Sequence, residues 1–261
     1  MMVLPRDDII ASRGPGSPRP QAHPEEWIWR KNLWNMRTSS RSSRPSALGT
    51  PENVAGMERF GIKPEHALGV TMPNIRKLAS EAGRDHALAL RLWGSGFNEA
   101  RILASLVEDP ALVTEEQAES WVSDFNSWDV CDQVCMNLFW LTPFAYDKCF
   151  EWASREEEFV KRAGFALMAR IAWRDKDVSD ERIAGFLPVI KKEATDERNF
   201  VKKAVNWALR QIGKRDIALN EQAIATAFQI QALDSKSARW IAADALRELQ
   251  SEAVQRRLVE S

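Results

Sequence analysis

Helical periodicity runs through almost the whole chain from about Pro51 onward, and it constrains the fold more than any other feature. Apolar residues recur there with the spacing of a helix, and no alternating pattern of convincing strand length interrupts them. Stop signals follow the apolar stretches at Asp109-Pro110, Thr142-Pro143 and Gly213, and the candidate caps Thr114 and Ser127 precede the next stretches. The sequence therefore predicts an all-α body whose helices of about ten to sixteen residues are joined by short turns.

A weak internal repeat divides this body. The segment Phe159–Ala163 aligns with Phe200–Ala204 at an offset of 41 residues, and a third copy begins near Lys236. Periods of about 40 to 47 residues with two helices in each unit are typical of HEAT-like stacking, which forms a curved solenoid with a concave inner face. We therefore expect residues 51–261 to form a single domain of HEAT-like repeats.

Residues 1–50 differ in kind from this body. They are rich in Pro, Ser and Arg, with eight basic residues against four acidic ones, and such a composition is typical of disorder. Trp27, Trp29 and Trp34 stand in a short basic stretch that is either one helix packed on the body or a motif for a partner or a membrane surface. We expect a disordered or partly helical N-terminal extension.

Composition excludes several classes of protein. No apolar run reaches the length of a signal peptide or a transmembrane helix, so we expect no membrane association. The cysteines Cys131, Cys135 and Cys149 make no disulfide framework and indicate a reducing compartment, with the cytoplasm as the default. The three histidines all lie in the N-terminal third, away from the cysteines. The sequence therefore does not favour a zinc site, or a Ser-His-Asp or Cys-His mechanism.

The charges of the chain are segregated, although the whole is nearly neutral with 36 Lys and Arg against 37 Asp and Glu. Residues 161–215 hold fourteen basic and seven acidic residues. Segregation of this kind can give a neutral protein a basic surface that meets phosphate. Helices with many lysines can also simply have solvated faces.

The helix around Trp207 favours the phosphate interpretation. At about 100° per residue, its apolar face consists of Val201, Ala204, Val205, Ala208 and Ile212. On the opposite side fall Lys203, Trp207, Arg210 and Lys214. An indole in a row of cations suits stacking beside a phosphate backbone, although Trp207 could also belong to the core of a second helical layer.

Two charged residues stand among apolar ones. Asp132 follows Trp128 by one helical turn in an otherwise apolar row, so its carboxylate needs a partner or a purpose. The helix dipole near the start of this helix favours the ionised carboxylate of Asp132. An ionised carboxylate suits the stabilisation of a positive charge better than the role of a general acid. Arg162 begins an apolar helix, where a cation is unfavourable unless an anion lies opposite. Structural roles remain open for both, as a cap or as partners in an ion pair.

These residues together resemble the AlkD-like DNA alkylation repair proteins, which are HEAT-like DNA glycosylases. The resemblance runs from about Pro51 to the C-terminus. The motifs that carry it, in order, are Phe60-Gly61-Ile62, Gly69-Val70 with Pro73 and Arg76, Leu92-Trp93, Glu99-Ala100-Arg101, Ser127-Trp128-Asp129 with Asp132, Arg162-Ala163, and residues 201–210.

The resemblance implies a protein that holds duplex DNA in a basic concave groove and hydrolyses the N-glycosidic bond of cationic purines such as 7-methylguanine or 3-methyladenine. It implies that the catalytic residues are Asp132, Trp128, Arg162 and Trp207. Together with the basic stripe, it predicts DNA contacts by Lys161, Lys203, Arg210 and Lys214. Neither a metal nor an organic cofactor is expected, and the partner is double-stranded DNA bound by a monomer.

Two alternatives remain open at this level. Some proteins of the family lack excision activity, so a non-catalytic DNA-binding HEAT-repeat protein is the first alternative. A solenoid alone would also suit a protein-interaction scaffold.

Overall fold

The computed structural model describes residues 49–260. The chain divides into two units, Met1–Ser46 and Ala47–Ser261, and all described residues belong to the second. The predicted N-terminal extension, with its three tryptophans, therefore lies almost wholly outside the described residues. Among residues 49–260, no helix combines the length and the apolar character needed to span a bilayer.

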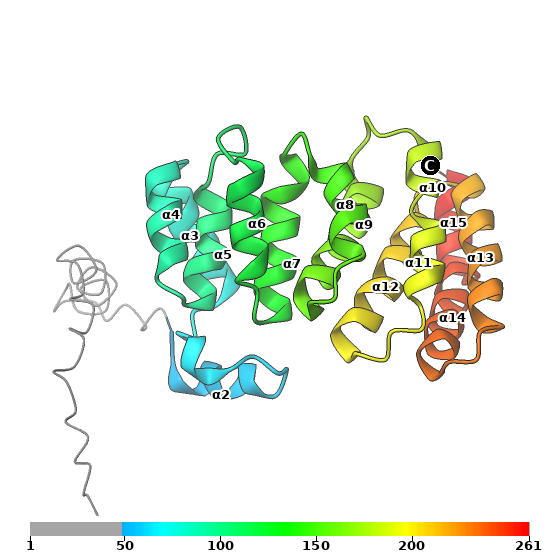
Figure 1. Ribbon diagram of the computed structural model, residues 1–261, viewed down its shortest axis with the longest axis horizontal. Helices are drawn as coiled ribbons and strands as arrows, with labels where there is room; N and C mark the ends of the chain where they lie inside the picture. The colour runs from blue at the N-terminus through cyan, green and yellow to red at the C-terminus, as the bar shows by residue number, and fades with distance from the viewer. Residues whose placement is uncertain (1–48, 261) are drawn as a thin grey trace, which may run out of the picture. The chain divides into compact units, whose positions relative to one another are not determined.

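Helices make up nearly all of the regular structure between residues 49 and 260 (Figure 1). In chain order they are α2 (Pro51–Glu58), η1 (Pro64–His66), α3 (Met72–Ala82), α4 (His86–Gly94), α5 (Asn98–Val107), α6 (Glu115–Ser123), α7 (Trp128–Asn137), η2 (Phe139–Leu141), α8 (Ala145–Ala153), α9 (Glu158–Arg174), α10 (Asp180–Ala184), α11 (Leu187–Glu193), α12 (Asn199–Ile212), α13 (Ile217–Gln231), α14 (Lys236–Leu249) and α15 (Glu252–Glu260). An isolated bridge between Gly49 and Val70 is the sole β-type pairing in this range. The all-α prediction is confirmed.

The helices stack as successive repeats. α5, α7, α9, α12 and α14 pack one against the next in that order, and we call this row the central row. α4, α8 and α13 each pack on the central-row helix that follows them in the chain, and α11 packs on α12. The segments Phe159–Ala163 and Phe200–Ala204 begin two neighbouring helices of this row, and Lys236 begins the third. The expected HEAT-like repeat architecture is confirmed.

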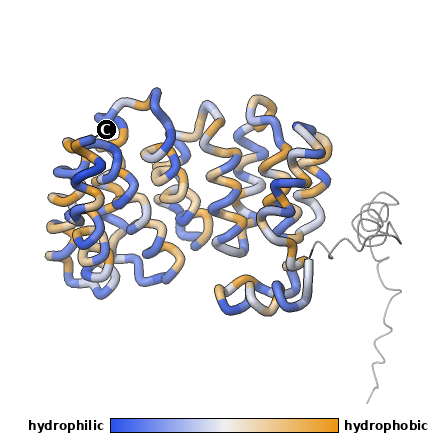
Figure 2. Tube along the Cα trace, turned by 180° about the vertical axis from the view of Figure 1, so that it is seen from behind, coloured by the Kyte–Doolittle hydropathy of each residue, from blue (hydrophilic) through white to orange (hydrophobic). Residues whose placement is uncertain are grey.

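Polar and apolar residues alternate along the helices in step with their turns (Figure 2). α12 illustrates the pattern, because all five residues of its predicted apolar face are fully buried. Thr114 caps α6 as expected, since its hydroxyl accepts a hydrogen bond from the backbone N–H of Gln117 at 3.2 Å. Ser127 occupies the cap position of α7, but its hydroxyl donates to the Asp129 carboxylate at 2.5 Å instead of capping the helix.

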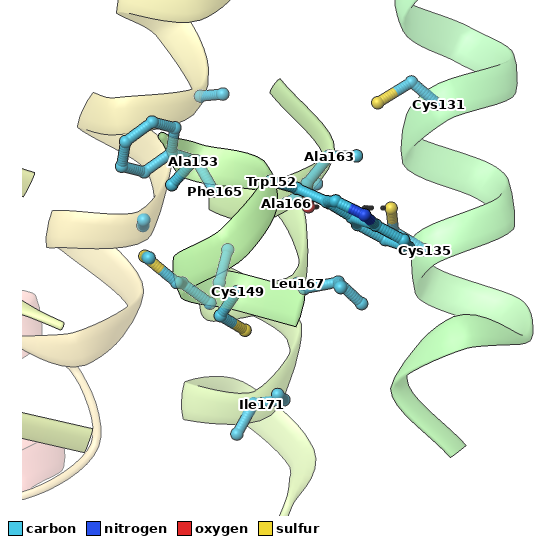
Figure 3. Packing of buried hydrophobic residues seen from close by; sticks show 14 of the residues in the cluster. Cys131, Cys135, Cys149, Trp152, Ala153, Ala163, Phe165, Ala166, Leu167 and Ile171 are labelled. Carbon is cyan, nitrogen blue, oxygen red and sulfur yellow. Dashed lines mark hydrogen bonds between the residues drawn. The ribbon is translucent and has the colours of Figure 1, made fainter. Parts of the chain in front are cut away.

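α9 runs through the middle of the stack and is buried on nearly every side, as its composition predicts. Gly164 makes this possible, because a Cβ atom there would lie 2.4 Å from the backbone nitrogen of Ala153 in α8. On the other side, the Cys135 thiol of α7 donates to the Ala163 carbonyl at 3.7 Å (Figure 3). These close approaches fix the axial position of α9 and therefore the position of Arg162 near its start.

Candidate functional site

A cavity of about 570 Å³ opens where a turn after α2 meets the first turns of α7, α9 and α12. Its volume lies in the range of small-molecule sites. The cavity is lined by Arg59, Phe60, Gly61, Trp128, Asp132, Arg162, Asn199, Phe200 and Lys203. The lining therefore holds three cations, one carboxylate and three aromatic rings. This combination favours an anionic ligand with an apolar or aromatic part.

Asp132 and Arg162 form a bidentate ion pair at this cavity. The Arg162 Nε donates to Asp132 Oδ1 at 2.8 Å, and one terminal nitrogen donates to Oδ2 at 2.7 Å. The other terminal nitrogen donates to the Phe200 carbonyl of α12 at 2.5 Å. The Asp132 side chain keeps 15% of its surface exposed and that of Arg162 keeps 7%. The Asp132 carboxylate, for which the sequence left an ion pair open, thus has Arg162 as its partner, and it still lines the cavity.

The protonation of this pair follows from burial and mutual attraction. Burial raises the pKa of the Asp132 carboxyl above its ordinary value, the Arg162 guanidinium opposes that rise, and the nearby Asp129 adds to it. Burial lowers the pKa of Arg162, but Asp132 outweighs burial, so the net change is upward. A guanidinium held in two charge-assisted hydrogen bonds keeps its proton. The pair is therefore ionic at neutral pH.

Trp128 joins the turn after α2 to α7. Its indole Nε1–H donates to the Phe60 carbonyl at 2.9 Å, across 68 positions of the chain. The indole is half-buried and forms one wall of the cavity, one helical turn before Asp132. The spacing seen in the sequence therefore places both side chains at one site.

Two exposed cations flank the cavity. Lys203 lies one turn into α12, and Arg59 belongs to the turn after α2. Among residues 49–260, neither Lys203 nor Arg59 forms an ion pair or a side-chain hydrogen bond, so neither charge is neutralised there. Both side chains are therefore available to an anionic ligand.

The other residues expected at the site lie elsewhere. Trp207, one turn beyond Lys203, is half-buried against the core and lies outside the cavity lining. Arg210 and Lys214 both pair with Glu248 of α14, and the distance from Lys214 Nζ to Glu248 Oε1 is 2.6 Å. The expected basic stripe is thus partly neutralised by the next repeat.

Lys161, the remaining residue of the predicted DNA contacts, is buried and paired with two carboxylates. Its side chain is only 7% exposed, and its ammonium lies 2.7 Å from Glu193 and 3.8 Å from Asp196. A lysine buried between two carboxylates presents little of its charge at the surface, so this geometry does not favour the predicted DNA contact by Lys161. Helix periodicity alone did not reveal the acidic neighbours in α11 and in the loop after it.

Five residues of the lining were not predicted from the sequence, namely Arg59, Phe60, Gly61, Asn199 and Phe200. Phe60 and Gly61 were noted only as part of a motif. Phe200 occupies the same repeat position as Phe159, whose ring centroid lies 5.5 Å away. The repeat offset of 41 residues was the available signal, because it places Phe200 at the start of α12, the helix next to α9 in the central row.

The fold and this cavity define a HEAT-like repeat protein with a cationic, aromatic-lined site. Residues 46–249 match the sequence model of the DNA alkylation repair enzyme family. The chain belongs to that family. No curated protein sequence matches it.

Two solved structures are similar to this chain. One has a TM-score of 0.68 and 18% identity over 85% of this chain and 94% of its own; it is described as a new family related to the HEAT-like repeat DNA glycosylases, with affinity for branched DNA structures. The other, an engineered protein, has a TM-score of 0.36 and 13% identity over 76% of this chain and 97% of its own, a likeness too weak to carry an argument. The first shows that this chain has a fold related to the HEAT-like repeat DNA glycosylases.

Proposed function

We propose that this protein is a monofunctional DNA glycosylase that hydrolyses the N-glycosidic bond of cationic alkylated purines in duplex DNA and leaves an abasic site. The observation that carries the proposal is the convergence of Trp128, Asp132 and Arg162 at one cavity, from two separate helices. Family membership supports the same chemistry. Trp207 of α12 lies outside the cavity lining, so the proposal does not depend on it.

The residue types suit this reaction. An alkylated purine is already a cationic leaving group, so the C1′–N bond can break with its electron pair going to the base, and no general acid is needed. The deoxyribose then carries oxocarbenium character, which a nearby carboxylate stabilises electrostatically. Water supplies the oxygen that bonds to C1′, and its proton leaves to solvent.

Asp132 can stabilise that charge even while paired. Each carboxylate oxygen has two acceptor positions, and Arg162 uses one on each. The remaining positions and the exposed part of the carboxylate are available to a sugar in the cavity. Arg162 holds the carboxylate in place, since its third contact to the Phe200 carbonyl anchors it to α12.

The surrounding residues would position the DNA. Lys203 and Arg59 flank the cavity and can each meet a phosphate of the bound strand. Trp128 and Phe200 give the cavity apolar walls that exclude water from one side of the sugar.

The test measures purine release from methylated duplex DNA. The wild-type protein should release 7-methylguanine or 3-methyladenine, and Asp132→Asn should abolish release while duplex affinity stays within about twofold. Asp234→Asn is the matched control, because Asp234 is fully exposed away from the cavity. Release by Asp132→Asn at the wild-type rate would refute the catalytic role.

One observation favours a second candidate, a non-catalytic DNA-binding protein of the same family. Each oxygen of Asp132 accepts a hydrogen bond from the positively charged Arg162, which weakens the electrostatic attraction between the carboxylate and a cationic sugar. The solved relative comes from a family described with affinity for branched DNA. This candidate predicts salt-dependent binding of duplex or four-way-junction DNA without base release, weakened when Lys203 and Arg59 are both changed to Ala.

A further inference from the structure

The first turn of α7 is attached to α5 by a short chain of polar side chains. The amide nitrogen Nδ2 of Asn98, the first residue of α5, donates to the Ser127 hydroxyl at 3.2 Å. That hydroxyl donates in turn to the Asp129 carboxylate at 2.5 Å. We call these three residues the α5–α7 link. Asn98 and Ser127 are only 1% and 2% exposed, so the hydrogen bond between them is shielded from solvent.

The α5–α7 link surrounds Trp128 in the chain. Ser127 and Asp129 are its two sequence neighbours, so a side chain on each side of Trp128 takes part in the link. The Trp128 indole then donates to the Phe60 carbonyl, and the Asp132 carboxylate lies one turn further along α7. Because side-chain direction follows the helix backbone, the position of this first turn decides how both groups enter the cavity.

Ser127 connects two helices instead of stabilising the start of one. It stands at the cap position of α7, where a serine hydroxyl ordinarily accepts from a backbone N–H two or three residues further on. Here the hydroxyl makes no such hydrogen bond; it accepts from Asn98 and donates to Asp129. The helix start is therefore held from α5.

Stability alone does not explain an asparagine at position 98. The side-chain oxygen Oδ1 of Asn98 is buried and has no hydrogen-bond partner among residues 49–260. A buried oxygen without a partner destabilises a folded chain, which offsets the single hydrogen bond to Ser127. An apolar side chain of similar size would avoid this penalty. The contact that Asn98 does make is thus better explained by what Ser127 holds in place.

We propose that Asn98 is a positioning residue, which acts through Ser127 to fix the first turn of α7. It thereby holds the Trp128 indole and the Asp132 carboxylate in the geometry that the reaction requires. A displacement of about 1 Å at a reacting group can slow a reaction about a hundredfold. The effect on base release rests on the proposed function, whereas the effect on the Trp128 indole can be measured without it.

The first measurement follows the Trp128 indole by NMR in the full chain. Hydrogen exchange of the indole N–H reports its hydrogen bond to the Phe60 carbonyl, and the signal lost in Trp128→Phe assigns it. Asn98→Leu keeps the side-chain volume and removes the donor, so indole exchange should become about tenfold faster. The same variant also removes the unpartnered oxygen, so it should melt no lower than the wild-type protein.

Ser127 offers a second variant and a rescue. Ser127→Ala removes the α5–α7 link and should speed indole exchange as Asn98→Leu does. Ser127→Thr keeps the hydroxyl, and a β-branched side chain suits the extended backbone there, so exchange should stay at the wild-type rate. The matched control is Asn137→Ala, because Asn137 donates to Ser105 at 3.3 Å at the far ends of the same two helices. It should change neither indole exchange nor base release.

The second measurement is the single-turnover rate of base release at saturating DNA. Asn98→Leu and Ser127→Ala should lower this rate about tenfold and leave DNA affinity unchanged, which separates misplaced groups from lost binding. Ser127→Thr should release base at the wild-type rate.

Two results would overturn the proposal and leave the proposed function standing. One is wild-type indole exchange in Asn98→Leu and Ser127→Ala, and the other is wild-type release rates in both variants. If the wild-type protein itself releases no base, the proposed function fails alone. Indole exchange then decides whether Asn98 positions Trp128.

Discussion

Asp132 and Arg162 depend on each other at the scale of single residues. Their side chains are mostly buried, and each satisfies the other through two hydrogen bonds. Removing one charge from such a pair leaves the other buried without compensation, which costs far more than the pair contributes. The ion pair is thus the structural role that the sequence analysis left open for both residues, and it also lines the cavity.

Arg162→Ala should lower the free energy of unfolding by about 3 kcal/mol, because it leaves the Asp132 carboxylate unpaired. Urea denaturation measures this. Arg239→Ala is the control, since its pair with Asp234 is exposed and should contribute less than about 1 kcal/mol. Adding Asp132→Asn to Arg162→Ala should recover part of the loss. Full additivity of the two changes would contradict the coupling.

The rate of base release should fall as the pH drops through the pKa of Asp132. Burial raises that pKa above the ordinary 3.8 of an aspartate. Only the anion stabilises a cationic sugar, so activity is present above the raised pKa and is lost below it. A pH profile of release, corrected for spontaneous depurination, should show its acid midpoint above 3.8. A rate that stays constant down to that pH would contradict the assignment.

Glu99 connects two elements of the described fold. This buried residue of α5 accepts hydrogen bonds from the backbone N–H groups of Leu68, Gly69 and Val70 at 2.7 to 3.2 Å. The segment that leads into α3 is therefore held by one carboxylate. Burial raises the pKa of Glu99, and these hydrogen bonds oppose the rise.

Glu99→Ala should leave these N–H groups without an acceptor and lower the free energy of unfolding by about 3 kcal/mol. Glu99→Gln should cost less, since one oxygen remains. Hydrogen exchange at Leu68, Gly69 and Val70 is the specific readout and should accelerate more in Glu99→Ala than in Glu99→Gln. Unchanged exchange at these amides would show that other contacts hold the segment.

At the element scale, periodicity predicted the helices well because burial of one face decides where a helix forms. The apolar face of α12 was predicted from residue spacing, and the burial of α9 follows from its apolar composition. The turn at Phe60 and Gly61 could not be, because it is fixed by Trp128 and Phe200, which lie far away in sequence. Ser127 does not cap α7, since its hydroxyl oxygen accepts from the Asn98 amide of α5 and its proton is donated to Asp129.

The charges of the whole molecule are balanced between repeats. Arg210 of α12 and Lys214, which follows the end of this helix, face Glu248 of α14, and the hydrogen bonds they donate outweigh burial and lower the pKa of that carboxyl. A helical wheel places cations on one face but says nothing of the acids on the next helix. This is why the repeat and fold were predictable from the sequence, whereas the extent of the basic surface was not.

Glu248→Gln should release these two cations for DNA. Duplex binding should tighten, and the slope of log affinity against log salt should steepen by about one for each cation that gains a phosphate. Glu151→Gln is the matched control, because Glu151 pairs with Lys148 within α8, outside the central row. An unchanged slope in Glu248→Gln would place DNA away from this part of α12.

The measurement that tests the central claim most directly is single-turnover release of 7-methylguanine from methylated duplex DNA with protein in excess. Wild-type protein should release the base with first-order kinetics, well above the spontaneous rate, and leave an abasic site in the strand. Asp132→Asn should release none at equal DNA occupancy. Wild-type protein that saturates the DNA and releases no base above background would contradict the account and identify a DNA-binding protein without glycosylase activity.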